Sequence, residues 1–214
     1  MGVYLLGDIA DCNSLSAHER GRMPLEGITL DWEYRETNKE LDKLDEATKG
    51  VKKYYLYGNH EDRYFRTMQM VDNFKYGKAL LSPTEGLRLR ERGYKVKENW
   101  KEDYFLIGRH LEGIHGFYTN KYPAQKHLSE LKTSCIFPHT HRVDVAVDGN
   151  MSATNIGWLG DKEAEVFQYA SRIAKKGWVN AFDITTIDSH GYYYNQLIQC
   201  FQNRFYYAGK RYGG

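Results

Sequence analysis

The sequence predicts an α/β fold in which two packed, mixed β-sheets are flanked by helices, an α/β/β/α sandwich. In the first half, short apolar runs alternate with helical patterns, as in strands joined by crossover helices. In the second half, β-leaning segments follow one another with turn residues between them, which is typical of antiparallel hairpins. The chain has 214 residues, enough for one domain with a sizeable core, expected to span 1–214.

The first half opens in the apolar run Val3–Leu6, a strand that turns directly into Gly7. Apolar positions at steps of three and four over residues 30–47 predict an amphipathic helix that ends near Gly50. The further elements expected here are a strand at Lys53–Tyr57, a helix at Arg63–Phe74, a helix start at Ser82-Pro83-Thr84-Glu85, and strands at Tyr94–Lys97 and Tyr104–Ile107.

The second half contains one expected crossover and then a series of strands. The crossover joins strands Leu111–Ile114 and Ser134–Phe137 through a helix at Ala124–Leu131. The β-leaning segments that follow are Arg142–Val147, Met151–Asn155, Val179–Ile187, Tyr192–Ile198 and Arg204–Tyr207, interrupted by one helix near Glu163–Ala174.

Composition sets broad limits on function. The net charge of +2 gives no strong electrostatic argument for nucleic acid. No apolar run approaches the ~18 residues of a membrane span, so no membrane partner is expected. The three scattered cysteines show no zinc or disulfide spacing, and a reducing cytoplasm is the simplest location. Eighteen tyrosines are unusual; they could serve a half-wet sheet surface, hold a partner or stack bases, and packing explains them equally well.

The informative feature is a series of polar residues that each follow a strand-like run. Asp8 and Asp11 follow the first strand, Asn59 and His60 follow Tyr54–Tyr57, and His115 follows Leu111–Ile114. His139 and His141 follow Cys135–Phe137. Strand ends are where an α/β sheet gathers its site residues. Carboxylate, amide and imidazole ligands together suit Mn, Fe, Zn or Ni better than Ca.

These residues resemble the calcineurin-like metallophosphoesterase superfamily, whose pattern runs D-x-H, G-D-x-x-D, G-N-H-[ED], H and G-H-x-H. Four of the five elements occur in family order, with Pro138 in place of the last glycine. The segments Trp178–Ile187 and Arg204–Tyr212 are similar to phosphoesterases often found in phage genomes. For a phage-encoded protein, the implied location is the host cytoplasm.

The resemblance implies a role for each matching position. Asp8 would bridge two divalent metal ions, Mn foremost, with Fe, Zn, Ni or Mg as alternatives. Asn59, His115 and His139 would complete the second metal site, and His141 would bind the first. If the segment 139–141 is extended, both imidazoles face the same way. The implied catalytic residues are His60, a general acid at the leaving-group oxygen, and Asp11, which would orient it.

The family's first element, D-x-H, has no counterpart before residue 3. Without it the first metal site is incomplete, and the first strand would have an exposed edge. Three explanations stay open: an N-terminally incomplete chain, an upstream polypeptide that supplies the strand and D-x-H, or a degenerate one-metal protein. Asp188 and His190 also form a D-x-H, but between two β segments it is better explained as a hairpin turn.

The predicted activity is therefore metal-dependent hydrolysis of a phosphoester, with a nucleic-acid (DNA or RNA) or nucleotide phosphodiester favoured by the phage-type resemblance. A phosphomonoesterase or protein phosphatase is the alternative enzyme. It fits less well, because Cys12 and Asn13 stand where the protein-phosphatase pattern has Arg and Gly. A catalytically inactive one-metal scaffold subunit is the non-enzymatic alternative. The sequence does not determine the oligomeric state.

Overall fold

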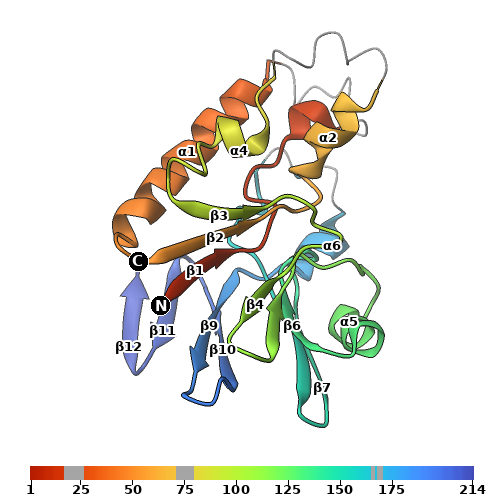
Figure 1. Cartoon of the computed structure of the whole chain (residues 1–214), viewed down its shortest axis with the longest axis vertical. Helices are drawn as coiled ribbons and strands as arrows, with labels where there is room; N and C mark the ends of the chain where they lie inside the picture. Colours follow the sequence, from red (N-terminus) through yellow and green to blue (C-terminus); the bar gives the residue numbers. More distant parts are fainter. Residues whose placement is uncertain (17–26, 71–79, 165–166, 168–170) are drawn as a thin grey trace. The chain divides into compact units, whose positions relative to one another are not determined.

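The computed structural model describes residues 1–16, 27–70, 80–164, 167 and 171–214. The chain divides into two compact units, residues 1–103 and 104–214 (Figure 1). Both units combine strands and helices, which confirms the α/β class. The single metallophosphoesterase domain expected over 1–214 stays a prediction.

The first unit is built on a parallel three-stranded sheet in the order β1-β2-β3. Its strands are β1 (Gly2–Leu5), β2 (Lys52–Leu56) and β3 (Tyr94–Lys97). The connection from β1 to β2 contains α1 (Leu30–Ala47), as periodicity predicts. Among the described strands, β1 pairs only with β2, so it lies at an edge of this sheet, as expected.

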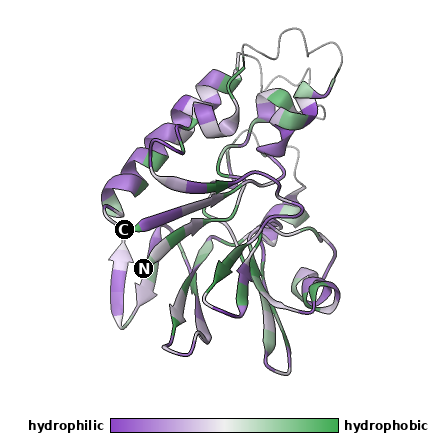
Figure 2. Ribbon diagram, in the orientation of Figure 1, coloured by the Kyte–Doolittle hydropathy of each residue, from purple (hydrophilic) through white to green (hydrophobic). Residues whose placement is uncertain are grey.

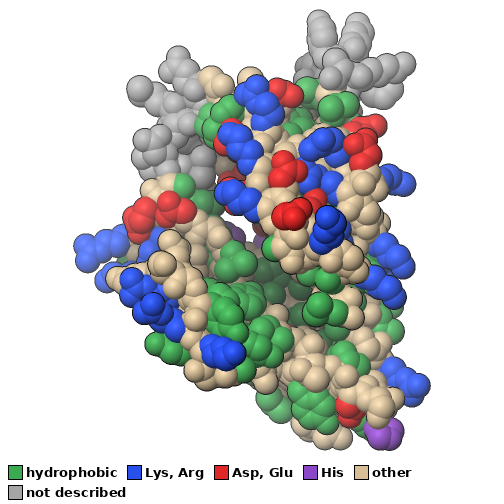
Figure 3. Space-filling model, turned by 90° about the vertical axis from the view of Figure 1, so that its left-hand side faces the viewer, with side chains coloured by type: hydrophobic (Ala, Val, Ile, Leu, Met, Phe, Trp, Pro, Cys, Tyr) green, Lys and Arg blue, Asp and Glu red, His purple; other side chains and the backbone are tan. Residues whose placement is uncertain are grey.

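Helix α1 is amphipathic, and Figure 2 shows it as largely hydrophilic with hydrophobic residues at intervals. The Thr29 side chain caps its N-terminus by accepting a hydrogen bond from the Trp32 amide at 3.2 Å. Its buried face presents Leu30, Tyr34 and Leu41 to the core of the unit. Acidic and basic side chains are interspersed in the upper part of Figure 3.

The described part of the first unit also contains three short helices: the 3₁₀ turn η1 (Asn13–Leu15), α2 (Asp62–Met68) and α4 (Pro83–Gly86). The helix start predicted at Ser82 is confirmed as a capping box between Ser82 and Glu85. Helix α2 covers the beginning of the helix expected at 63–74; residues 71–74 lie outside the described residues.

Tyrosines in this unit have two roles. Tyr55 and Tyr57 are fully buried in its core, and their hydroxyl groups bond to Glu61 and Thr84. Tyr4 and Tyr54 stack on each other across the sheet at 4.4 Å between ring centroids. The half-wet sheet surface proposed for tyrosine therefore describes only some of them.

The second unit contains a mixed five-stranded sheet in the order β4-β5-β6-β8-β7. Strands β5 and β6 are parallel neighbours joined through α5, and β6 pairs in parallel with β8. The bounds are β4 Phe105–Ile107, β5 Leu111–Gly113, α5 Pro123–Leu131, β6 Ser134–Phe137, β7 Val143–Asp148 and β8 Met151–Ile156. The predicted crossover is confirmed, and its core includes Ile114, Leu128 and Phe137.

Beyond this sheet, the described residues of the second unit form two antiparallel hairpins and a short helix. They are β9 (Ala181–Ile187) with β10 (Tyr193–Gln199), β11 (Arg204–Tyr207) with β12 (Lys210–Gly213), and α6 (Arg172–Lys176). Helix α6 overlaps only the end of the helix expected at Glu163–Ala174, where residues 165, 166 and 168–170 lie outside the described part of the chain. No helix of the described residues is both long enough and apolar enough to cross a bilayer.

Candidate functional site

In the first unit, the loop after β1 carries Asp8 in the left-handed backbone region, with φ of 57°. Gly7 before it also has a positive φ, of 97°. Consecutive residues of this kind turn the chain sharply at the strand end. Asp8 tolerates this because short polar side chains adopt the left-handed conformation more readily than bulky ones.

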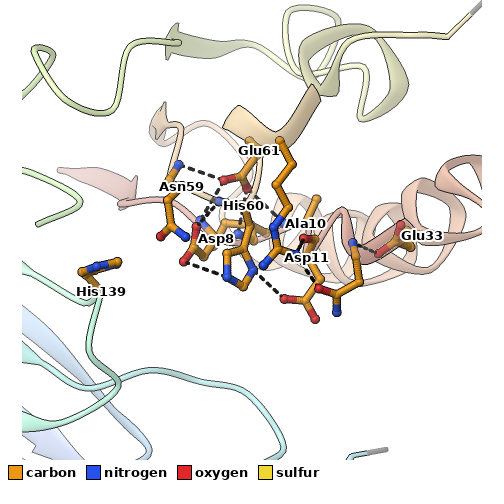
Figure 4. Close-up of polar contacts among 12 residues, drawn as sticks. Asp8, Ala10, Asp11, Glu33, Asn59, His60, Glu61 and His139 are labelled. Atoms are coloured by element: carbon orange, nitrogen blue, oxygen red, sulfur yellow. Dashed lines mark hydrogen bonds and ion pairs between the residues drawn. The ribbon is translucent and has the colours of Figure 1, made fainter. Parts of the chain in front are cut away.

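The Glu61 carboxylate holds this loop in place. The side chain is fully buried, at the start of α2. Among the described residues it accepts hydrogen bonds from the amides of Asp8 (2.9 Å), Ile9 (2.9 Å), Ala10 (3.1 Å) and Gly58 (2.8 Å) and from the Tyr55 hydroxyl (2.7 Å). One carboxylate thus joins the loop after β1 to the loop after β2 (Figure 4).

His60 lies between two aspartates of the same unit. Its amide donates to Asp8 Oδ1 at 2.9 Å, and its Nδ1 lies 2.8 Å from Asp11 Oδ1. Its Nε2 is 3.8 Å from Asp8 Oδ2. Burial opposes a charge on the imidazole, but the carboxylates of Asp8 and Asp11 outweigh burial and raise the pKa of His60. The predicted His60–Asp11 contact is therefore present.

A second buried carboxylate positions the segment that carries Asp11. Glu33 of α1 accepts hydrogen bonds from the Asn13 amide at 2.6 Å and the Ser14 amide at 3.1 Å. Burial raises the pKa of Glu33, although these hydrogen bonds oppose the change. Arg63 donates to the Asp11 carbonyl at 2.7 Å and to the Asn13 side chain.

Asn59 precedes His60 in the same turn. Its carbonyl accepts a hydrogen bond from Arg66 at 2.7 Å, which ties the turn to the body of α2. Figure 4 shows the Asn59 and Asp8 side chains beside each other. The structure therefore brings together the four first-unit residues named from the sequence, Asp8, Asp11, Asn59 and His60.

In the second unit, His115 and His139 form a pair. His115 follows β5 and is fully buried, whereas His139 follows β6 and is partly exposed. His115 Nε2 lies 3.0 Å from His139 Nδ1, and the His139 amide donates to the His115 carbonyl at 3.2 Å. Parallel pairing of β5 with β6 accounts for this arrangement, because it aligns the two strand ends.

Residues 139–141 are not extended, so the condition under which both imidazoles would face the same way is not met. His141 has a φ of 59°, and its amide donates to the Pro138 carbonyl at 2.9 Å, which closes a turn. The His141 ring stacks on Trp158, with centroids 4.4 Å apart and an interplanar angle of 10°. It also makes an edge contact with Trp178. Pro138 at the start of the segment favours the turn over a continued strand. The metal role of His141 stays a prediction.

The hairpin explanation of Asp188 and His190 is confirmed. Both residues lie in the turn between β9 and β10, where Asp188 Oδ1 accepts from the amides of His190 and Tyr192, each at 2.9 Å. Two further histidines have packing roles. His127 is buried and bonds to the Pro123 carbonyl and the Phe117 amide, and His110 stacks on Tyr192. His18 lies outside the described residues.

Reasoning from the sequence missed the three residues that organise the first-unit loops: Glu61, Glu33 and Arg63. Glu61 was visible as the last letter of the G-N-H-E run, but its bonding required the fold. Glu33 lies on α1, where an acidic residue is expected to be solvated, so no local signal distinguished it.

No family model matches the chain, and no curated protein matches it. The solved structures similar to it include two of Vps29 from Entamoeba histolytica. A double mutant has 14% identity and a TM-score of 0.37, with 81% of this chain and 87% of that chain covered. A single mutant has 14% identity and a TM-score of 0.35, with 75% and 89% covered.

Proposed function

We propose that this protein is a metal-dependent phosphoesterase in which His60 acts as the general acid. The observation that carries the proposal is the contact of His60 with Asp11 on one side and Asp8 on the other. A histidine held by one carboxylate beside a second, metal-binding carboxylate suits proton delivery to a leaving group. The ligand set is the one predicted from the sequence: Asp8, Asn59, His115, His139 and, for a first metal, His141.

The chemistry of the donors within each unit fits a transition metal. Asp8 and Asn59 offer hard oxygen atoms, and His115 and His139 offer borderline imidazole nitrogens. His115 Nε2 and His139 Nδ1 lie 3.0 Å apart, so these two nitrogens would be the imidazole ligands that hold an ion. Bound there, an ion would supply an activated water and a positive charge for the phosphate oxygens; Mn is foremost, with Fe, Zn, Ni or Mg as alternatives.

The protein's own residues supply the rest of the mechanism. Protonated His60 would donate from Nε2 to the departing oxygen, and the bond between Nδ1 and Asp11 would hold the ring in that orientation. The aspartates favour the protonated form that a general acid needs. Donation of this kind contributes typically ~10²–10⁴-fold to the rate. Glu61 would keep Asp8 and His60 in register through its bonds to both loops.

The experiment measures metal content and hydrolysis of bis(p-nitrophenyl) phosphate by the full chain with added Mn. We expect Asp8→Asn and His139→Ala each to lower metal content and turnover together. His60→Ala should keep the metal and lose about 10²–10⁴-fold of turnover for diesters with poor leaving groups. His190→Ala is the matched control, because that histidine is exposed in the β9–β10 turn.

Two outcomes would reject the proposal. If Asp8→Asn or His139→Ala left the metal content unchanged, these residues would not share an ion. Bound metal without turnover of diester, monoester or phosphopeptide substrates would favour the inactive scaffold instead. Turnover of phosphoserine peptides but not of nucleic acid would instead favour a protein phosphatase.

A one-metal version of the site is the second candidate. The turn at His141 and its stacking on Trp158 favour it, because an imidazole used in ring packing is less available for coordination. This candidate predicts one tightly bound ion per chain and an unchanged metal content in His141→Ala. The two-metal enzyme predicts two ions and the loss of one of them in that variant.

A further inference from the structure

The C-terminal segment, residues 189–214, includes the β11–β12 hairpin and is rich in aromatic residues. It has three Lys or Arg side chains, eight aromatic side chains and no Asp or Glu. The basic residues are Arg204, Lys210 and Arg211. A segment with this composition is electrostatically suited to a polyanion, in contrast to the nearly neutral chain as a whole.

Strand pairing sorts these residues onto two faces. In the β11–β12 register, Tyr206 is opposite Arg211, and Phe205 is opposite Tyr212. Phe205 stacks on Tyr212 at 5.1 Å and packs edge-on against Phe182 of β9. The face with Phe205 therefore packs against its own unit. The alternate face presents Arg204, Tyr206 and Arg211 outward.

Phe201 extends this outward face. It pairs with Arg204 through two backbone hydrogen bonds, of 2.8 and 3.0 Å, and its ring is 68% exposed. Tyr206 is also 68% exposed, so both rings are open to solvent. In the lower part of Figure 3, basic side chains border an area of hydrophobic side chains, tyrosine included.

The same residues line a hollow of about 450 Å³ between β10 and the hairpin. Its wall includes Gln199, Phe201, Arg204, Tyr206 and Arg211, together with Leu197 and Ile198 of β10 and Phe205 from the hairpin's other face. A volume of this size is within the range of small-ligand sites, ~300–1,000 Å³. Guanidinium groups, exposed rings and side-chain amides are the groups that hold phosphates, stack on bases and bond to base edges.

We propose that this face, defined by Phe201, Arg204, Tyr206 and Arg211, binds single-stranded nucleic acid. The two arginines pair with backbone phosphates, and bases stack on Phe201 and Tyr206. A duplex is a poorer ligand because its bases are already stacked on each other. The inference deepens the proposed function by naming its substrate class, and it rests on that function only for the cleavage that follows binding.

The binding test uses the full chain, a chelator and a fluorescein-labelled oligothymidylate of about 15 nucleotides, near the upper end of known site sizes. Fluorescence anisotropy should show binding that weakens with salt and is tighter than for a duplex. Tyr206→Ala should weaken binding by roughly 5–150-fold, the range for loss of one stacked base. Arg211→Ala should lower the slope of log affinity against log salt by about 0.7.

Lys210→Ala is the matched control. It removes one positive charge from the same hairpin, but Lys210 pairs with Tyr207 and belongs to the other face. We expect less than about a two-fold loss of binding, since one charge off the contact face acts only through screened solvent. Equal losses in Arg211→Ala and Lys210→Ala would overturn the proposed face in favour of nonspecific attraction.

A second readout separates this inference from the proposed function. Tyr206→Ala and Arg211→Ala should slow cleavage of single-stranded DNA while turnover of bis(p-nitrophenyl) phosphate stays unchanged. An active enzyme that does not bind the oligonucleotide would overturn the inference alone. Binding of the oligonucleotide without any hydrolysis would support the proposed nucleic-acid-binding face and contradict the proposed phosphoesterase activity. A change of oligomeric state in the hairpin variants, without a change in oligonucleotide binding, would identify the face as a contact between copies of the chain and overturn the inference.

Discussion

In the first unit, buried carboxylates hold the loops that carry the candidate site residues. Glu61 joins the loops after β1 and β2, and Glu33 holds the 3₁₀ turn that follows Asp11. In the second unit, His115 and His139 follow paired strand ends, and their rings contact each other directly. Gly116, which has a positive φ, and the ring of Phe137 lie beside His139.

The two units differ in the kind of interaction that holds a site residue in place. A buried carboxylate with several donors fixes a loop strongly but fails completely when one partner is lost, because the remaining groups stay buried and unpaired. Packing around a glycine fixes a residue by excluded volume, so its failure is graded by the size of the added group. The two units should therefore respond differently to substitution and to pH.

The largest effect is expected for Glu61→Gln. The amide has nearly the same shape, but its nitrogen is a donor, so it repels the amide hydrogens that one carboxylate oxygen now accepts. We expect a loss of about 3–5 kcal/mol in the free energy of unfolding, similar to breaking a buried charge network. Urea denaturation followed by circular dichroism measures it.

Glu40→Gln is the control for Glu61→Gln, since Glu40 pairs with Lys43 on the surface of α1 with side chains more than 70% exposed. Its effect should stay within about 0.5 kcal/mol. A loss below about 1 kcal/mol in Glu61→Gln would mean that water replaces the carboxylate, and the contrast between the units would disappear.

In the second unit, Gly116→Ala tests the packing that supports His139. Gly116 has a φ of 105°, and an added Cβ would lie 2.9 Å from Phe137 and 3.1 Å from the His139 Cβ. Backbone strain and crowding together should cost about 2–4 kcal/mol. Displacement of His139 should also lower metal affinity, which a metal titration of the folded variant measures.

Gly149→Ala separates the two contributions to that cost. Its φ of 58° is also positive, but a Cβ there has no heavy atom within 4 Å. We expect about 1 kcal/mol from strain alone and no change in metal affinity. Equal effects of the two alanines would show that crowding against Phe137 and His139 is unimportant.

The sequence was informative wherever one residue type and its neighbours determine the geometry. Periodicity located α1, a capping box located α4, and apolar runs located the strands that precede Asp8, Asn59 and His115. The alternation of strands and helices was sufficient for the α/β class. Local patterns also identified the turn at Asp188.

The sequence failed where the outcome depends on distant partners. Glu33 and Glu61 are acidic residues that would ordinarily be solvated, and only the fold shows that amides surround them. His141 has strand neighbours on its N-terminal side, but the Pro138 turn and Trp158 determine its conformation. Spacing alone cannot reveal either kind of long-range contact.

The smallest effect expected concerns the pH dependence of stability, and it has opposite signs in the two units. Asp45 accepts hydrogen bonds from Lys53 at 2.6 Å and Arg92 at 2.5 Å. Burial alone would raise the pKa of Asp45, but Lys53 and Arg92 outweigh burial and lower it. The stability from this carboxylate is therefore present above the usual Asp pKa of ~3.9 and is lost as pH falls through the lower, folded-state value.

In the second unit, burial raises the pKa of Asp183, against an opposing hydrogen bond from Thr185. The stability that the Asp183 carboxyl group contributes is present below pH ~3.9, the usual Asp pKa. It is lost as pH rises through the raised, folded-state pKa. Asp45→Asn should thus cost about 1–3 kcal/mol at neutral pH and progressively less in acid. Asp183→Asn should be neutral or slightly stabilising, by up to about 1 kcal/mol, at neutral pH, with that difference vanishing in acid. Calorimetric melting across pH measures both, and curves of the same sign would mean that buried charge acts alike in the two units.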